Sequence, residues 1–494
     1  MLRTSRPPSV HSTNTELGDP FSAHLRPPPG ETEPDRQLRL QQEAEAKRIS
    51  DSIDEELKQD AKRISKRKQD VKLLLLGQAE SGKSTLQKQF QLMYNPNSLE
   101  EERLSWRPVV YYNIVRPIRR IFEVVDAYAE LDYDDPESVI GTPDSVGIGS
   151  SSGDHSIDST TAEREISTLR LRLSPLLTTE ASLAERLSGG NAAAAPSAKG
   201  NLLVRSGWQL LGKGKRDRTS YGGRNSLDAA PRRSDDSGKA DTDKLIEEVA
   251  AILSACKDDV RELWEHHHVR KLREKRRLRL EEWAEFFLDN ITRVSSSGYI
   301  PTTDDILHAR IQTMGVAEHI FDMSLHGRTV TWHLYDVGGA RGQRHTWVPY
   351  FDDASAIIFM APVSAFDQYL EEDPRTNRID DSLQLFTNIC SHRLLKHAHL
   401  VLFLNKTDVL QAKIARGVRV NKYITSYGDR PNEFDSVVNY FRAHFTQVHK
   451  RNNESMRVLY THLTSVVDKK ATHSVITNVR DSIFRVYLQS AALV

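Results

Sequence analysis

The stretch Val71–Thr85 reads V-K-L-L-L-L-G-Q-A-E-S-G-K-S-T and decides the fold. A short apolar run ends at Gly77, and Gly82-Lys83-Ser84 follows four residues later, which gives the pattern G-x-x-x-x-G-K-[ST] between a buried strand and a helix. Glycines let the backbone fold around a phosphate chain, so that successive N–H groups face its oxygens. The stretch therefore predicts a phosphate-binding loop, in which Lys83 reaches the β- and γ-phosphates and Ser84 binds Mg²⁺. A chance match in a glycine-containing loop is the alternative, and the strand before and helical run after the loop argue against it.

Composition limits the class of protein. The chain has 494 residues, enough for two or three domains, and its 68 Lys+Arg balance 68 Asp+Glu, so no global charge favours nucleic acid or membrane. The only cysteines, Cys256 and Cys390, favour a reducing compartment. No apolar run approaches the roughly 18–20 residues of a transmembrane helix, and the N-terminus has no secretory segment. We expect a cytoplasmic protein.

The N-terminal 70 residues divide into two parts. Residues 1–35 are rich in Pro, Ser and charge, which predicts a disordered tail. Residues 36–70 lack Pro and Gly and carry apolar residues near a helical repeat, which predicts one helix with a thin apolar stripe. Such a stripe is typical of a docking face, although a solvated helix without a partner remains the alternative.

Residues 96–300 read as a helical domain inserted between two parts of the nucleotide domain, 71–95 and 301–494. Leu99–Leu131 and Asp241–Arg293 have long helical patterns. The low-complexity insert between them, at about 132–241, holds only short helical fragments at Thr168–Leu177 and Ala181–Leu187, and most of it lacks the apolar residues needed for a core. A variable surface loop is the favoured interpretation of this insert over a regulatory one.

Strands and helices alternate in residues 301–494. The expected strands are His319–Leu325, Thr329–Tyr335, Ala356–Pro362, His399–Leu404 and Arg457–Thr464, and the expected helices are about 382–395, 434–449 and 472–488. Alternation of this kind predicts an α/β fold with a mostly parallel sheet and helices on both faces.

Two features of the helical block have ordinary explanations. The basic run Arg270–Arg279 lacks interleaved aromatic residues, so a solvated helix face is favoured over nucleic-acid binding. His266-His267-His268 are consecutive, and consecutive residues of a helix do not project to one side, so no structural metal site is expected there.

Two further motifs define the nucleotide. Asn405-Lys406-Thr407-Asp408 directly follows a strand, where the Asp408 carboxylate can accept from the N1–H and 2-amino group of guanine. Adenine has neither donor and would leave the carboxylate unpaired, so the motif predicts guanine selectivity. Asp336-Val337-Gly338-Gly339 closes another strand, where Asp336 would hold the Mg²⁺ shell through water and the Gly339 N–H would contact the γ-phosphate.

These residues resemble the α subunits of heterotrimeric G proteins over about 36–93 and 241–494, in a fungal-like form with an enlarged helical domain. The resemblance rests on G-x-x-E-S-G-K-S-T and on Tyr299-Ile300-Pro301-Thr302, Asp305-Ile306-Leu307, Arg310, Thr313, Gly315, Trp347, Phe351, Phe359, Asn377-Arg378, Phe403-Leu404-Asn405-Lys406, Tyr460-Thr461-His462 and Thr464. A small monomeric GTPase is the runner-up, but such a chain has neither a helical insertion nor an internal Arg before the switch Thr.

The resemblance implies a Ras-like GTPase domain, with a mostly parallel six-stranded sheet and an inserted all-α domain, that binds GTP or GDP with Mg²⁺. It assigns to the nucleotide Glu80, Ser81, Gly82, Lys83, Ser84, Thr85, Leu307, His308, Ala309, Arg310, Ile311, Gln312, Thr313, Asp336, Val337, Gly338, Gly339, Asn405, Lys406, Thr407, Asp408 and Val466.

Several of these residues take specific roles through the resemblance. Ser84 and Thr313 would be the side-chain Mg²⁺ ligands. Arg310 would be the arginine finger supplied in cis, with Glu80 placed to pair with it or with a neighbour. The backbone N–H of Val466 would contact guanine O6. Lys406 would lie along the guanine face, and Gly338-Gly339 would be the hinge of the segment Ala340–Tyr350.

The largest departure from the family is Ala340, which stands where the family has the Gln that orients the attacking water. A methyl group cannot hydrogen-bond a water, and Gln343 lies three positions later. We therefore expect catalysis to rest on Arg310 and Lys83 and GTP hydrolysis to be slow. A nucleotide-locked scaffold with negligible hydrolysis is the alternative, and a P-loop kinase is disfavoured by Asn405–Asp408.

The expected partners are those of the family: a Gβγ dimer on the helix at 36–70, a G-protein-coupled receptor, regulators of G-protein signalling and an effector that the sequence does not identify. The start Met1-Leu2-Arg3 offers no Gly at position 2 and no early Cys, so N-terminal lipidation has no acceptor. We expect the protein to reach the cytosolic face of the plasma membrane by association, with Tyr487–Val494 as a receptor-docking tail.

Overall fold

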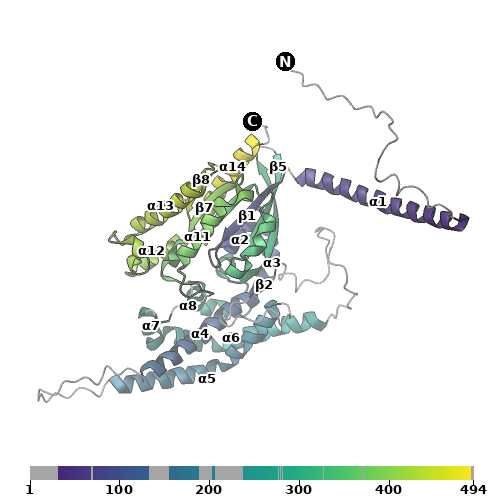
Figure 1. Ribbon diagram of the computed structural model, residues 1–494. Helices are drawn as coiled ribbons and strands as arrows, with labels where there is room; N and C mark the ends of the chain where they lie inside the picture. Colours follow the sequence, from purple (N-terminus) through teal and green to yellow (C-terminus); the bar gives the residue numbers. More distant parts are fainter. Residues whose placement is uncertain are drawn as a thin grey trace, which may run out of the picture. The chain divides into compact units, whose positions relative to one another are not determined.

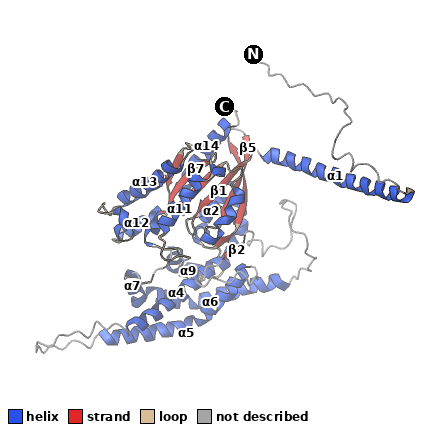
Figure 2. Ribbon diagram, in the orientation of Figure 1, coloured by secondary structure: helices blue, strands red, loops and turns tan. Residues whose placement is uncertain are grey.

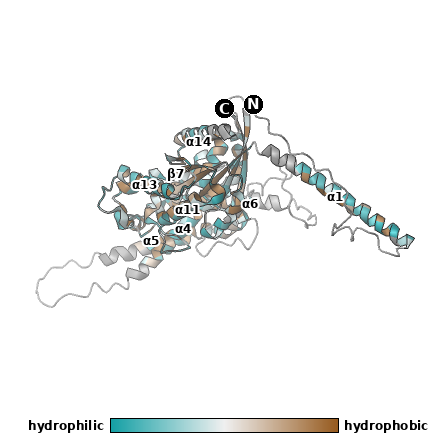
Figure 3. Cartoon of the chain, turned by 45° about the horizontal axis from the view of Figure 1, so that its top comes forward, coloured by the Kyte–Doolittle hydropathy of each residue, from teal (hydrophilic) through white to brown (hydrophobic). Residues whose placement is uncertain are grey.

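A computed structural model describes residues 32–67, 70–132, 155–188, 203–205 and 237–490, with short gaps at 276, 279, 281, 326–327, 371 and 455. The chain divides into two units, residues 1–69 and 70–494. In the first unit, α1 (Glu33–Arg67) begins within the segment that we expected to be a disordered tail. Figure 3 shows α1 as largely hydrophilic, and the apolar residues on it, such as Ile49, Ile53 and Leu57, are exposed.

The second unit contains a six-stranded sheet in the order β4-β5-β1-β6-β7-β8 (Figures 1 and 2). The strands are β1 (Val71–Gly77), β4 (Val316–Leu325), β5 (Arg328–Val337), β6 (Ala356–Pro362), β7 (His399–Asn405) and β8 (Leu459–Leu463). Only the β4–β5 pair is antiparallel, and the four other pairs are parallel. The predicted fold class, a mostly parallel sheet of six strands, is confirmed.

The alternation of side chains along β1 explains how helices cover both faces of the sheet. Leu73 and Leu75 belong to the core beneath α2 (Lys83–Tyr94) and α14 (Lys469–Ser490). Leu74 and Leu76 belong to the opposite core, beneath α11 (Arg378–Ser391) and α13 (Phe434–Asn452). A strand buried on both sides needs apolar residues at every position, which is why the sequence before the phosphate-binding loop is continuously aliphatic.

A helical block follows α2 in the chain. It contains α3 (Pro96–Glu102), a 3-10 turn at Arg103–Trp106, α4 (Arg107–Asp132), α5 (His155–Ser188), α6 (Ser237–Glu265), α7 (His267–Glu274), α8 (Glu282–Asp289) and α9 (Ile291–Val294). These helices share one apolar core, in which α4 packs against α5 and α5 against α6 (Figure 1). The two long helical patterns of the sequence are thus each divided into shorter helices. Among the described residues, no helix is long and apolar enough to cross a membrane.

The helix α5 corrects our expectation for the insert at 132–241. Instead of the two fragments Thr168–Leu177 and Ala181–Leu187, one helix of 34 residues runs through both. Its buried residues Ile166, Leu169, Leu173, Leu176, Leu183 and Leu187 recur at helical spacing and complete the core of the block. The low-complexity composition around them concealed this stripe.

The role of α5 as a core element can be tested with one substitution. Leu173 is fully buried, whereas Leu171 on the same helix is 77% exposed. We expect Leu173→Ala to lower the free energy of unfolding by about 2–5 kcal/mol, because it leaves a cavity in the core. Leu171→Ala should change it by less than about 0.5 kcal/mol. Urea unfolding followed by circular dichroism measures both, and equal effects would contradict a buried α5.

Candidate functional site

A cavity lies where the carboxyl ends of β1 and β7 meet the helical block. Most of the residues that the sequence assigned to the nucleotide line it: Glu80, Gly82, Lys83, Ser84, Thr85, Leu307, His308, Ala309, Arg310, Ile311, Gln312, Thr313, Val337, Gly339, Asn405, Lys406, Asp408 and Val466. Five of the assigned positions do not line the cavity: Ser81, Asp336, Gly338, Ala340 and Thr407. The structure thus brings together motifs that lie more than 300 residues apart.

The phosphate-binding loop needs glycine for a steric reason. Gly82 has φ +100°, and a Cβ atom there would lie 2.4 Å from Asn405 Nδ2. The buried Lys83 ammonium donates to the carbonyl oxygens of Gly77 (2.9 Å) and Gln78 (2.6 Å). Burial lowers the pKa of Lys83 to about 8. The loop therefore holds the Lys83 ammonium at the N-terminus of α2, which is where a phosphate chain is recognised in proteins of this kind.

Three side-chain oxygen atoms that could bind a hard metal ion lie close together around Ser84, the residue after Lys83. Ser84 Oγ donates to Asp336 Oδ2 (2.6 Å), and Thr313 Oγ1 lies 3.0 Å from Ser84 Oγ and 3.3 Å from Asp336 Oδ2. The other carboxylate oxygen, Asp336 Oδ1, is buried and has no hydrogen-bond partner among the described residues. Two hydroxyls and a carboxylate form the donor set that Mg²⁺ prefers, so the residues fit this ion.

Arg310 is held in place by contacts with the phosphate-binding loop and with the helical block. Its side chain forms an ion pair with Glu80, which also pairs with Arg378 at 2.8 Å. Burial alone would raise the pKa of Glu80, but Arg310 and Arg378 outweigh it and hold this pKa well below its usual range. The backbone of Arg310 exchanges two hydrogen bonds with the Asn113 side chain on α4, at 2.6 and 3.0 Å.

Asn405 joins the phosphate-binding loop to the loop at 464–467. Its Nδ2 donates to the Ser81 carbonyl (2.8 Å), while its Oδ1 accepts from Thr464 Oγ1 (3.1 Å) and from the Val466 N–H (3.2 Å). The resemblance gave the Val466 N–H to guanine O6, but here that N–H is engaged by Asn405. Lys406 follows with φ +62°, and both Lys406 and Asp408 line the cavity.

The segment after β5 contains Ala340, at the position where the family has Gln, and Gln343 three residues later. Ala340 caps a run of 3-10 turns at Arg341–Tyr350 and presents only a methyl group. A Cβ atom on Gly338 would lie 1.7 Å from Gln343 Oε1, so the Gln343 side chain folds back against Gly338. Gln343 lines neither the nucleotide cavity nor the smaller pocket beside Arg310 and Gly339. It is not positioned to substitute for the missing carboxamide.

Sequence reasoning missed three residues at this site. Asn113 and Trp283 come from the helical block, and no motif identifies them; the Trp283 side chain lines the cavity, with its buried Nε1 unpaired among the described residues. Lys88 lies one turn after Ser84 and could have been noticed as a cation on an otherwise buried helix face. Its ammonium donates to the carbonyls of Ile306 (2.7 Å) and Ala309 (2.9 Å) and lies 4.2 Å from the centre of the Trp106 ring.

The buried Lys88 makes stability depend on pH. Burial lowers its pKa to about 7, against 10.5 as the ordinary value. Between these two pH values the unfolded chain binds more protons than the folded chain, so stability rises with pH, by at most about 1.4 kcal/mol per unit from this residue. We expect Lys88→Met to flatten the rise of the unfolding free energy between pH 7.5 and 9.5, measured by urea unfolding. Lys396→Met, at an exposed lysine, should leave the slope unchanged; an unaltered slope in Lys88→Met would refute the assignment.

The parallel sheet, the glycine loop and the oxygen cluster define a P-loop nucleotide-binding protein. Comparison with known proteins narrows this class: the family model for the G-protein alpha subunit matches residues 47–483. The chain is 32% identical to a guanine nucleotide-binding protein alpha-4 subunit of the fungus Mycosarcoma maydis, over 96% of both chains. It is 27% identical to an alpha-7 subunit of Caenorhabditis elegans, over 91% of this chain and 97% of that relative. It is 26% identical to an alpha subunit of Candida albicans, over 90% of this chain and 95% of that relative.

The chain therefore belongs to the G-protein alpha subunit family. Members of this family bind guanine nucleotides and are GTPases that act in signalling.

Proposed function

We propose that this chain is a GTP/GDP switch that couples a seven-transmembrane receptor to an intracellular effector. The observation that carries the proposal is the meeting of two motifs at one cavity. The oxygen cluster of Ser84, Thr313 and Asp336 lies on one side, and the motif Asn405–Asp408 lies on the other. A ligand that reaches both carries a phosphate chain with Mg²⁺ at one end and a base with adjacent donors at the other.

Each residue has a distinct task in this proposal. Lys83 exchanges the loop carbonyls for phosphate oxygens, and Asp408 accepts from the guanine donors. Mg²⁺, held by Ser84 and Thr313 with Asp336 behind them, would neutralise charge on the β- and γ-phosphates. Arg310, held at the cavity by Glu80 and Asn113, spreads the charge that develops on the transferring phosphoryl group.

The same geometry supports slow hydrolysis. At position 340 a methyl group stands in place of a water-orienting carboxamide, and the Gln343 side chain does not line the cavity. This observation also favours the second candidate, a nucleotide-locked scaffold with negligible turnover. The two candidates share the fold and the binding site, and they differ only in whether phosphate is released.

The proposed partners follow the family. The exposed apolar residues of α1, among them Leu38, Ile49, Ile53 and Leu57, would dock a Gβγ dimer. A receptor, regulators of G-protein signalling and an effector complete the proposed set. Association with these partners would place the chain at the cytosolic face of the plasma membrane.

Nucleotide binding tests the function directly. With purified protein and millimolar Mg²⁺, calorimetry should show GDP binding at least about 10³-fold tighter than ADP, because a site built for the guanine donors rejects adenine strongly. Ser84→Ala should weaken the Mg²⁺ dependence of GTP binding, whereas Ser391→Ala, at an exposed serine outside the cavity, should not. Equal affinity for GDP and ADP would contradict the proposal. Single-turnover phosphate release from bound GTP then separates a slow switch from a locked scaffold.

A further inference from the structure

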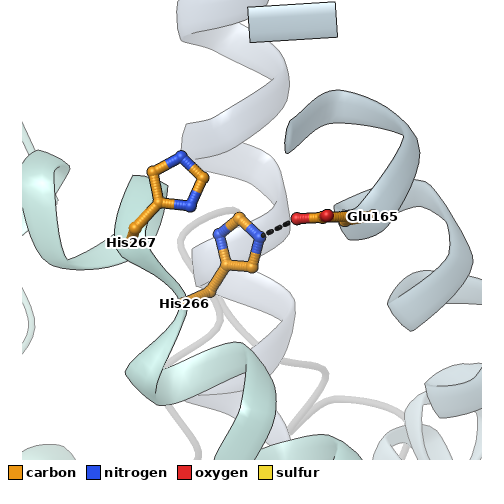
Figure 4. Close-up of side chains that lie close together, drawn as sticks. All are labelled: Glu165, His266 and His267. Carbon is orange, nitrogen blue, oxygen red and sulfur yellow. Dashed lines mark hydrogen bonds and ion pairs between the residues drawn. The ribbon is translucent and has the colours of Figure 1, made fainter. Parts of the chain in front are cut away.

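A cluster of metal-binding side chains lies in the helical block, apart from the nucleotide site. Glu165 on α5, together with His266 and His267 at the junction of α6 and α7, offers one ligand atom per residue within 4.8 Å of one another. Figure 4 shows the His266 ring between the Glu165 carboxylate and the His267 ring. None of the three residues lines the nucleotide cavity.

Two consecutive histidines can converge here because the first is not helical. His266 has φ −56° and ψ 134° and is the N-cap of α7, so the chain turns between α6 and α7 at this residue. The centres of the His266 and His267 rings lie 4.7 Å apart, and the planes are inclined by 33°. In a continuous helix, consecutive histidines project to different sides, which is why the sequence predicts no metal site here. His266 is a non-helical N-cap, so this restriction does not apply to His266 and His267.

The spacing of the first two ligand atoms fits a metal ion. His266 Nε2 lies 3.1 Å from Glu165 Oε2. In a tetrahedral zinc site with bonds of about 2.0–2.1 Å, neighbouring ligand atoms lie about 3.3–3.4 Å apart. The longest distance between two of the three ligand atoms, up to 4.8 Å, must shorten by about 1.5 Å to reach this value. His267 and Glu165 are exposed and can rotate to close it, whereas the His266 side chain is only 7% exposed and is held in place.

We propose that Glu165, His266 and His267 bind a divalent transition-metal ion of the zinc class. Two imidazole nitrogens and one carboxylate oxygen suit zinc, whereas Mg²⁺ and Ca²⁺ prefer oxygen ligands alone. The ion takes the position between His266 Nε2 and Glu165, and the imidazole proton moves to Nδ1. Nδ1 then gives up the long 3.3 Å hydrogen bond that it accepts from the His268 N–H.

Such an ion would connect α5 to the α6–α7 junction and so stabilise the helical block. Three protein ligands leave one coordination position for water, which makes the site open and exchangeable. The proposal is independent of nucleotide chemistry, because its ligands and the oxygen cluster at Ser84 belong to different parts of the fold.

Zinc binding to the full chain tests the proposal. Competition for Zn²⁺ with a chromophoric chelator, in millimolar Mg²⁺ and GDP, measures stoichiometry and affinity for wild type and three variants. We expect one zinc ion per chain, at least about tenfold weaker binding in Glu165→Gln and in His267→Ala, and wild-type binding in His268→Ala. His268→Ala is the matched control, because it removes the third histidine of the run and keeps the backbone N–H that donates to the capping side chain of His266.

Two further readouts decide the result. Zn²⁺ should raise the melting temperature of wild type and of His268→Ala but not that of His267→Ala. Co²⁺ in place of Zn²⁺ should give the intense visible absorption of a four-coordinate nitrogen–oxygen site, lost in Glu165→Gln. Equal zinc affinity in wild type, Glu165→Gln and His267→Ala, or no saturable binding to wild type, overturns the proposal.

Discussion

Asp408→Asn is expected to lower the affinity for GDP by on the order of 10³-fold or more, because the variant keeps an acceptor for only one of the two guanine donors and turns an NH₂ group toward the other. Asp408 lies in the first turn of α12 (Thr407–Ala415) and lines the cavity beside Lys406 and Val466. An amide in its place offers one acceptor and one donor, and the donor faces the 2-amino group of guanine. The buried 2-amino group of guanine would then be left without an acceptor.

Xanthine nucleotides make this prediction specific. Xanthine keeps the N1–H but carries an oxygen at position 2, which can accept from the new amide. Calorimetry with GDP and xanthosine diphosphate should therefore show an exchange of preference in Asp408→Asn. Asp429→Asn, at an exposed carboxylate outside the cavity, is the control and should keep the preference for GDP. Loss of both nucleotides together would point to unfolding instead of altered recognition, and an unchanged preference would exclude Asp408 as the guanine acceptor.

The sheet and the loop at Gly77–Ser84 could be predicted because local sequence determines both. A doubly buried strand must be aliphatic at each position, and a loop that approaches phosphate needs glycine where Gly82 stands. The motif Asn405–Asp408 was recognisable for the same reason: it follows a buried strand directly. These signals are short in sequence and depend little on the rest of the fold.

The contributions of the helical block could not be predicted, because they depend on packing between distant segments. Asn113 holds Arg310 by two hydrogen bonds across 197 residues of sequence, and a single Asn on a helix gives no sign of this. The α5 helix was missed for a different reason. Its regular leucine spacing lies within a low-complexity segment, and the composition of that segment predicts a surface loop instead of a core helix. The N-cap at His266 likewise depends on where α6 ends, which is the least certain property of a helical pattern.

Ala340→Gln is expected to accelerate hydrolysis of bound GTP by on the order of tenfold to a hundredfold, because a positioned carboxamide would orient the attacking water. Ala340 has φ −60° and ψ 145°, which any residue can adopt, so the substitution creates no backbone strain. Ala340→Met is the matched control, since its side chain has similar length but no hydrogen-bonding groups. Single-turnover release of phosphate from preloaded protein measures the chemical step, and GTP affinity should be similar in all three proteins.

Two further variants separate this explanation from its competitors. Arg310→Ala in the Ala340→Gln background should remove most of the acceleration, because the arginine is expected to stabilise the charge that the oriented water helps to develop. Gln343→Ala should leave the wild-type rate nearly unchanged, since the Gln343 side chain lines neither pocket. If Gln343→Ala slows hydrolysis tenfold with GTP affinity intact, Gln343 moves into the site on binding and replaces the missing residue. A wild-type rate equal to that of Ala340→Gln would show instead that this chain needs no carboxamide at position 340, and the proposed slow switch would be wrong.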